Sequence, residues 1–250
     1  MKIRTQAYLL LAVIALSCKQ KEDIGVIYRD DFESYSIGTF PASPWQKEGE
    51  GKIFVDDTRS VSGTNSVHFI TGEGYSERGF LKLPVNQFFR SEENEYYGSV
   101  NFWVNKASPD GIHWTMIENI GKVSGQEFSA MVRYGGQHAG RFMANYDTDG
   151  ISTDCWQHSQ TKLPEKEWFN IKWYFNGKEN LMKFWLNDQL IEDLTVKSIG
   201  EGCAKDENNG LWSFPIVEEV LIGWVDYQTG GGARELWVDD FILSRRPIIK

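Results

Sequence analysis

The stretch from Gly111 to Ser159 concentrates reactive and polar side chains inside segments that otherwise read as β-strands. It holds three of the chain's four histidines, together with arginines, amides and aromatic rings. Strands that only fill a core do not need such groups, because charged, amide and imidazole side chains are costly to bury without partners. Beside aromatic rings they indicate an open sheet face that contacts a polar, ring-shaped ligand. A sugar chain fits that description.

The candidate residues for such a contact fall into two groups. Within the stretch, they are His113, Arg133, Gln137, Asn145, Tyr146, Trp156 and His158. Outside it, Trp103 and Trp224 are candidates for stacking on sugar faces, and Tyr227 is a candidate for contact through its hydroxyl. Each candidate has a structural alternative, because tryptophans are mostly buried in cores and a histidine on a strand often only completes a hydrogen-bond network. His68, set in an apolar alternation, reads as structural.

Alternating hydrophobicity predicts the strands that must position these residues. From Tyr97 to Asn105, Phe102 and Val104 are expected to face the core, whereas Asn101 and Trp103 face out. An outward row of amide and aromatic side chains suits the floor of a cleft.

A β-hairpin is predicted where Phe169 to Phe175 and Leu181 to Asp188 flank the turn sequence Asn176-Gly177. Further strands are expected around residues 27–32, 53–55, 66–70, 79–83, 113–119, 128–134, 140–146, 217–224 and 235–243. No long segment has helical periodicity. Many short strands at this spacing predict an all-β fold, a two-sheet antiparallel β-sandwich of jelly-roll (concanavalin-like) type.

The same alternation restricts which candidates share a face. His113 should lie on the face opposite to Glu118, so on a regular strand they do not both line a cleft. Arg133 should share a face with Met131 and lie opposite to Tyr134.

Length and charge limit the possible functions. At 250 residues without a composition break after the N-terminal segment, the chain is expected to form a single domain over residues 26–250. The net charge of −9 argues against a nucleic-acid partner, whose binding requires a basic surface. Because the chain as a whole is negatively charged, an acidic polysaccharide could bind only at a local basic site. We expect a monomer that binds a polysaccharide.

The N-terminus has the features of a secretory signal. A basic start precedes the apolar run from Ala7 to Leu16, which is too short for a comfortable membrane span. Ala15-Leu16-Ser17-Cys18 resembles a bacterial lipobox, in which the cysteine is acylated. We therefore expect a signal peptide over residues 1–17, lipidation of Cys18, a tether over residues 18–25, and an exported lipoprotein at the outer membrane or cell surface. An ordinary signal peptide with an incidental cysteine is the alternative.

The other two cysteines, Cys155 and Cys203, can pair in an oxidising compartment. Two buried thiols are the alternative. The spacing of cysteines and histidines provides no zinc-binding pattern.

A series of short motifs stands in a distinctive order between residues 28 and 244. They are Asp30-Asp31-Phe32-Glu33, Ser62-Gly63-Thr64-Asn65-Ser66, His113-Trp114, Arg133-Tyr134, Asp154-Cys155-Trp156 and Ile222-Gly223-Trp224. In this order the chain resembles the jelly-roll polysaccharide-lyase-like family that includes glucuronan lyase and the fungal secreted proteins induced alongside cellulases. The resemblance implies β-elimination at a uronic acid.

That reaction needs a neutralised carboxylate, a base for the C5 proton and an acid for the leaving O4. Arg133 could hold the carboxylate with help from Gln137 or Asn145, and His113 could act as the base. The acid would be one of Tyr146, Tyr134 and Tyr227. Alternatively, Arg133 only forms an ion pair with Asp147 or Glu118.

Acids and loop oxygens at the two ends of the domain resemble the structural calcium site of carbohydrate-active jelly rolls. The candidate ligands are Glu33, Ser62, Asn65 and one of Asp239 and Asp240. Calcium prefers six to eight hard oxygen ligands, which carboxylates and loop carbonyls supply, so a Ca²⁺ ion here would pin the terminal strands. Solvated acids at strand ends are the alternative.

Two other functions compete with that of a lyase. The Glu-x-Asp-x-Glu and Glu-x-Asp-x-x-Glu spacings of jelly-roll glucanases are absent, which disfavours glycoside hydrolysis. A non-catalytic carbohydrate-binding surface lipoprotein would use the same aromatic and amide face without turnover.

Overall fold

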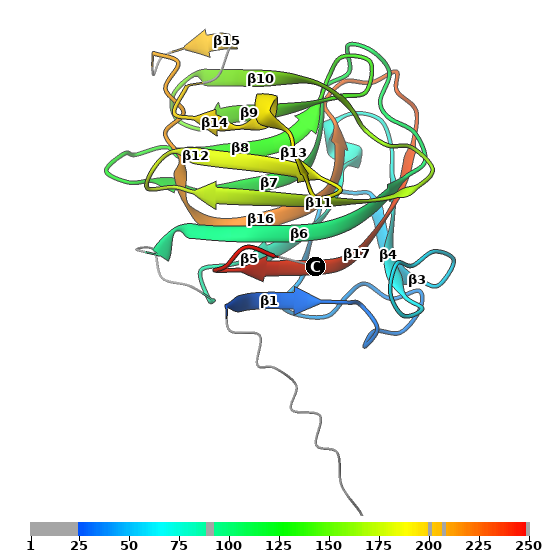
Figure 1. Ribbon diagram of the computed structural model, residues 1–250. Helices are drawn as coiled ribbons and strands as arrows, with labels where there is room; N and C mark the ends of the chain where they lie inside the picture. Colours follow the sequence, from blue (N-terminus) through cyan, green and yellow to red (C-terminus); the bar gives the residue numbers. More distant parts are fainter. Residues whose placement is uncertain (1–24, 89–92, 200–201, 207–208, 249–250) are drawn as a thin grey trace, which may run out of the picture.

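The structure is a computed structural model that describes residues 25–88, 93–199, 202–206 and 209–248 (Figure 1). The expected signal peptide, the lipidation candidate Cys18 and nearly all of the tether lie outside the described residues. Within the described part, no helix is both long and apolar enough to cross a membrane. The helical turns there are the short 3-10 helices η1 (Tyr75–Glu77) and η3 (Glu192–Leu194).

Two antiparallel sheets form the layers of a β-sandwich, and the predicted jelly-roll fold is confirmed (Figure 1). In sheet A the strand order is β13-β12-β11-β6-β17-β4-β3, with β1 paired to β17 and β14 to β12. Its strands are β1 (Val26–Asp30), β3 (Lys52–Asp56), β4 (Ser66–Thr71), β6 (Glu95–Val104), β11 (Trp168–Asn176), β12 (Leu181–Leu186), β13 (Gln189–Leu190), β14 (Val196–Lys197) and β17 (Arg234–Ser244).

Sheet B has the strand order β15-β10-β9-β8-β7-β16-β5-β2. Its strands are β2 (Gln46–Glu48), β5 (Gly79–Pro84), β7 (Trp114–Val123), β8 (Ser129–Gly136), β9 (Arg141–Thr148), β10 (Thr153–Lys162), β15 (Gly202–Asp206) and β16 (Pro215–Asp226). The stretch from Gly111 to Ser159 supplies the adjacent strands β7 to β10, so most of its polar residues lie in one sheet.

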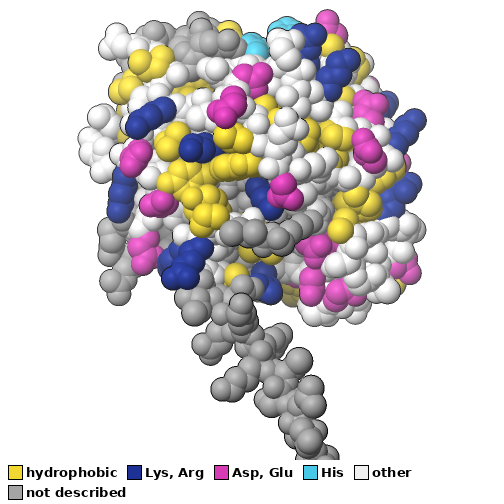
Figure 2. Space-filling model, in the orientation of Figure 1, with side chains coloured by type: hydrophobic (Ala, Val, Ile, Leu, Met, Phe, Trp, Pro, Cys, Tyr) yellow, Lys and Arg dark blue, Asp and Glu magenta, His cyan; other side chains and the backbone are white. Residues whose placement is uncertain are grey.

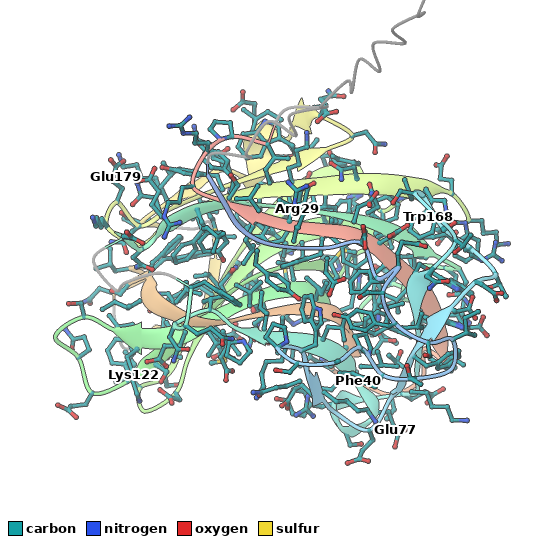
Figure 3. The ribbon with its side chains drawn as sticks, turned by 90° about the horizontal axis from the view of Figure 1, so that it is seen from below. Arg29, Phe40, Glu77, Lys122, Trp168 and Glu179 are labelled. Carbon is teal, nitrogen blue, oxygen red and sulfur yellow. The ribbon has the colours of Figure 1, made fainter. Side chains whose placement is uncertain are left out.

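The core lies between the two sheets and is built from alternate residues of each strand. On β6, Phe102 and Val104 are fully buried in it, whereas Asn101 and Trp103 lie on the outer face, as the alternation predicts. Seen from below, the layers lie one above the other, with Trp168 in the layer of sheet A and Lys122 in that of sheet B (Figure 3).

The predicted hairpin is present as β11 and β12. Asn176 shapes its turn, because its side-chain oxygen accepts the N–H groups of Lys178 at 3.0 Å and Glu179 at 3.1 Å. Gly177 is required by space as well, since a Cβ there would lie 1.9 Å from the amide nitrogen of Asn94. The turn therefore docks against the loop that precedes β6.

Cys155 is disulfide-bonded, and the residue directly opposite it across the β10–β15 pair is Cys203. A disulfide between these two residues would link the edge strand β15 to its neighbour β10.

Candidate functional site

A single row of side chains crosses the outer face of sheet B. Residues directly opposite one another in neighbouring strands share a face, and the register connects each member of the row to the next. From β10 to β5, the row is Trp156, Asn145, Arg133, Glu118, Leu221 and Lys82. Two of the predicted candidates, Asn145 and Trp156, thus lie in line with Arg133.

Arg133 is the centre of this row and is almost completely buried, with 6% of its surface exposed. Its Nε donates to Glu118, and its Nη1 donates to Asn145 at 3.0 Å and to Asp147 at 3.2 Å. Burial opposes the charge, but Glu118, Tyr227 and Asp147 outweigh it and hold the pKa of Arg133 above its ordinary value. The alternative of ion pairs with Glu118 and Asp147 is therefore present in the structure.

One terminal nitrogen of Arg133 has a weaker partner. Nη2 donates to the thioether sulfur of Met131 at 3.0 Å, and sulfur is a poor hydrogen-bond acceptor. Arg133 and Met131 therefore share a face, as the alternation predicts. The same alternation places Tyr134 in the core. The Tyr134 hydroxyl donates to the carbonyl of Leu194 at 3.3 Å. Tyr134 therefore lies away from this face.

His113 and Tyr227 form a stacked pair beside Arg133. Their ring centroids lie 4.6 Å apart with an interplanar angle of 28°, and the guanidinium of Arg133 lies 5.7 Å from the Tyr227 ring. Backbone bonds fix the pair, because the N–H of Tyr227 donates to the His113 carbonyl at 2.8 Å. The N–H of His113 donates to the side chain of Gln228, also at 2.8 Å.

The environment fixes the protonation of both rings. Burial, then the charge of Arg133 and finally His158 lower the pKa of His113 to about 3, so its imidazole is neutral at physiological pH. Its Nε2 is buried and has no hydrogen-bond partner among the described residues. Burial raises the pKa of Tyr227 to about 12, so its hydroxyl keeps its proton. A neutral imidazole and a protonated phenol are thus held in contact.

The prediction that His113 and Glu118 lie on opposite faces is wrong. A register shift between Thr115 and Ile117, typical of a β-bulge, adds a residue to β7. Ile117 remains in the core, whereas the Thr115 hydroxyl lies 3.4 Å from that of Tyr227 and Glu118 reaches Arg133. The bulge therefore allows His113 and Glu118 to approach Arg133 from the same face.

Two predicted contact residues lie in the core instead of on this face. Tyr146 is fully buried, its hydroxyl donates to the Ser213 carbonyl at 3.2 Å, and it alternates with Asn145 along β9. Trp224 is also fully buried and stacks on Trp114 at 4.7 Å. In both cases a large ring gains more from burial than a sheet surface offers. Neither residue can contact a ligand on the outer face of sheet B.

Trp103 lies on the outer face of the other sheet, where the guanidinium of Arg59 covers its ring at 3.9 Å. Trp103 therefore lies on the opposite side of the sandwich from Arg133, because β6 belongs to sheet A. The remaining candidates lie near the site. The ring centroid of His158 lies 5.4 Å from that of His138 and 6.3 Å from that of Trp156. Gln137 directly follows the end of β8, is half-buried, and has the same place in the alternation as Arg133.

Charged residues from β2, β5 and β16 extend the site in a way that the sequence interpretation missed. A cavity of about 170 Å³ is lined by Arg133, Tyr227, Glu118, Tyr75, Arg78, Lys82, Glu48 and Glu219. Lys82 lies 3.7 Å from Glu48 and 3.6 Å from Glu219. Its place in the apolar run Phe80 to Leu83 was the available sequence signal, because a lysine alternating with core residues must face out.

The calcium candidates converge around the loop that precedes β4. Glu33 accepts the N–H of Asn65 at 2.7 Å, and Asp239 accepts that of Ser62 at 3.2 Å. The Ser62 hydroxyl donates to Asp240 at 2.7 Å. The loop and acids from both ends of the domain thus lie close together.

These residues fit a calcium ion in part. Burial, reinforced by the charge of Asp240 and opposed by loop N–H bonds, raises the pKa of Asp239 to about 6. A cation nearby would lower that pKa again, because it would favour the charged carboxylate. However, no three Asp, Glu, His or Cys side chains converge on a metal position in the described part of the chain. Ser62, Asn65 and loop carbonyls would have to complete the ligand set with Glu33 and Asp240.

Comparisons with known proteins agree with this fold. The solved structure of "Cellulose induced protein, Cip1" is similar at a TM-score of 0.64 and 21% identity, covering 88% of this chain and 98% of that one. The endo-β-1,4-glucuronan lyase of the fungus Trichoderma reesei is similar at a TM-score of 0.59 and 11% identity, covering 88% and 95%. At these identities the likeness concerns the fold.

A binding domain of botulinum neurotoxin DC, solved with SialylT, is similar at a TM-score of 0.53 and 13% identity, covering 91% of this chain and 49% of that one. No curated protein matches the chain. A family model described as polysaccharide-lyase-like, Cip1-like core domain, matches residues 31–246. Because that match spans most of the sequence and the same region forms the sandwich, the chain belongs to the polysaccharide-lyase-like family of Cip1-like core domains.

Proposed function

We propose that the protein cleaves a uronic-acid-containing polysaccharide by β-elimination on the outer face of sheet B. The observation that carries the proposal is the contact between a neutral imidazole, His113, and a protonated phenol, Tyr227, beside the buried cation Arg133. β-Elimination needs an unprotonated base, a protonated acid and a positive charge for the carboxylate. These three residues supply that set.

In the proposed reaction, the substrate carboxylate takes the place of the Met131 sulfur at Nη2 of Arg133. His113 accepts the C5 proton on its neutral imidazole. The C5–H electrons form the C4=C5 double bond, the C4–O4 bond breaks, and the Tyr227 hydroxyl protonates O4. The imidazolium then returns a proton to the tyrosinate, which restores both residues. The substrate carboxylate helps His113 to accept the C5 proton, because a negative charge nearby raises the pKa of His113.

The test compares matched histidine variants. Purified protein is incubated with glucuronan, alginate and pectate, and the ultraviolet absorbance of the unsaturated product is followed. His113→Gln and Tyr227→Phe should each lower kcat roughly 10²–10⁴-fold. His138→Gln makes the same change on a half-exposed imidazole and should leave the rate unchanged. Equal losses in His113→Gln and His138→Gln, or no product from any uronan, would refute the proposal.

The second candidate is a carbohydrate-binding protein without turnover. It is favoured by the ion pairs that already engage Nε and Nη1 of Arg133. Binding of a uronan in isothermal titration, with no unsaturated product after prolonged incubation, would establish this alternative.

We further propose that the protein is exported as a lipoprotein through acylation of Cys18, and that a structural calcium ion joins Glu33, Ser62, Asn65 and Asp240. The sequence around Cys18 supports the first proposal. Metabolic labelling with a radioactive fatty acid should label the full chain but not its Cys18→Ser variant.

A further inference from the structure

The outer face of sheet A carries its own row of side chains, on the opposite side of the sandwich from Arg133. The register places Trp185, Lys172, Ser99, Ile242 and Arg29 directly opposite one another from β12 to β1. Four strand spacings make this row about 19 Å long. Figure 2 shows this face from the front, with hydrophobic side chains gathered near its centre and charges of both signs around them.

Two hollows lie along this row. One, of about 330 Å³, is lined by Tyr97, Trp185, Lys172 and Asp188 among others. The second, of about 280 Å³, is lined by Ser99, Asn101, Asn170 and Asp240 among others. Ile248, in the segment that follows β17, borders both hollows, so they adjoin. Together they form a groove, which we call the sheet A groove.

The rings at one end of the groove suit the flat face of a sugar. Tyr97 and Tyr174 lie with ring centroids 4.7 Å apart, and Trp185 is half-buried on the neighbouring strand. Lys172 is held at the floor by an ion pair with Asp188. An aromatic surface beside fixed polar groups is the usual composition of a site for a hydroxyl-rich ligand.

The other end of the groove contains a buried acceptor without a donor. The amide nitrogen of Asn170 donates to the Val100 carbonyl at 3.2 Å and to the Asn101 oxygen at 3.0 Å, which fixes the orientation of its amide. Its Oδ1 therefore faces away from these acceptors, and no described group donates to it. Only 7% of Asn170 is exposed. Such an acceptor lacks the donor that buried polar groups normally have, and a ligand hydroxyl in the hollow would supply one only after the neighbouring side chains shift.

The charges select among sugars. Apart from Asp240, which is assigned above to the calcium ion, three carboxylates line the two hollows, those of Asp30, Asp31 and Asp188, against the two cations Arg29 and Lys172. An anionic chain would meet a net negative surface here, whereas the hydroxyls of a neutral chain can donate to carboxylate and amide oxygens. The groove is thus unsuited to the uronates proposed for sheet B.

We propose that the sheet A groove is a second binding site, for an extended neutral polysaccharide. The protein would then hold a neutral chain on one face while the opposite face engages an acidic one. This inference is independent of whether sheet B is catalytic.

The test uses cellohexaose and xylohexaose as neutral probes and a glucuronan hexamer as the acidic one. Isothermal titration should detect binding of at least one neutral probe to the intact protein, and Trp185→Ala and Tyr97→Ala should each weaken it at least tenfold. Trp185→Phe, which keeps a ring, should retain most of the affinity. Binding of the acidic probe should be unchanged in all three variants, which also shows that they are folded.

A spectroscopic measurement locates the site. In ¹⁵N-labelled protein, the neutral probe should shift the indole N–H signal of Trp185 and leave that of the core residue Trp114 in place. Failure of both neutral probes to bind, or binding that Trp185→Ala and Tyr97→Ala do not weaken, would overturn the proposal. Loss of uronan cleavage with neutral binding retained would count only against the sheet B proposal.

Discussion

At the scale of single residues, Arg133 and Glu118 form a buried ion pair at the centre of the site. Both are about nine-tenths buried, and the guanidinium Nε donates directly to the carboxylate. Removing one partner of a buried pair leaves an uncompensated charge, which costs about 3–5 kcal/mol. We therefore predict that Arg133→Met lowers the free energy of unfolding in urea by about that amount, whereas the double variant Arg133→Met, Glu118→Gln recovers much of the loss.

The recovery distinguishes a coupled pair from independent packing. If the two single changes are additive in the double variant within about 0.5 kcal/mol, the residues do not depend on each other for stability. Lys172→Met, whose ion pair with Asp188 lies on the other sheet, is a suitable control because the carboxylate that it leaves is more than half exposed.

His113 should make the protein less stable in acid. Its pKa is near 6.5 when it is unfolded and about 3 in the folded protein, so the unfolded state binds the proton more readily. The stability that its neutral form contributes is therefore present above about pH 6.5 and is lost progressively as the pH falls toward 3, at about 1.4 kcal/mol for each pKa unit. The melting temperature of the native chain should fall more between pH 7 and pH 4 than that of His113→Gln. Parallel curves for the two proteins would show that His113 is not desolvated.

At the scale of elements, the sequence predicted most strands but not the faces of the central one. Alternation was correct for β6 and for the hairpin of β11 and β12, where each residue faces its neighbour in a regular register. It failed in β7, because a β-bulge between Thr115 and Ile117 has no turn residue to mark it. The bulge depends on pairing with β8 and β16, which lie far along the chain or across a loop. A local pattern does not contain that information.

Sheet assignment was the other missing information. Trp103 was correctly predicted to face out, but nothing in its segment says that β6 belongs to the sheet opposite Arg133. Similarly, the place of Lys82 beside Arg133 follows from the order β8-β7-β16-β5, which only the tertiary structure defines. Order along the chain was sufficient for the family and the fold, whereas the site required the strand order.

The edge strand β15 should depend on the disulfide of Cys155. This strand pairs only with β10 in the described sheet, and its register places Cys203 opposite Cys155. Replacing both cysteines by alanine should lower the free energy of unfolding by about 2–4 kcal/mol, because the unfolded chain regains the freedom of a long loop. Peptide mapping without reduction should recover a Cys155–Cys203 linked fragment. A free thiol at Cys203 would contradict this pairing.

At the scale of the whole molecule, the loop before β4 joins the beginning of the domain to its end. Glu33 follows β1 and holds Thr64 and Asn65, while Asp239 of β17 holds Ser62. Phe32 and Asp240 both adopt the left-handed backbone region, at φ 59° and 51°, which non-glycine residues rarely enter without compensation. A ligand that binds this junction would stabilise the complete sandwich, because it would hold both terminal strands at once.

Calcium should therefore raise the melting temperature of the intact protein. A ligand at a hundred times its dissociation constant adds about 2.7 kcal/mol, which in a domain of this size corresponds to roughly 5–10 °C. The comparison is between protein treated with a chelator and the same protein with calcium or magnesium restored; calcium should be the more effective ion, because the loop offers many flexible oxygens. Asp240→Asn should abolish the calcium response, whereas Asp149→Asn, an exposed acid on the β9–β10 turn of the other sheet, should retain it. If calcium leaves the melting temperature unchanged, the proposal of a structural calcium ion is wrong, and hydrogen bonds alone hold this junction together.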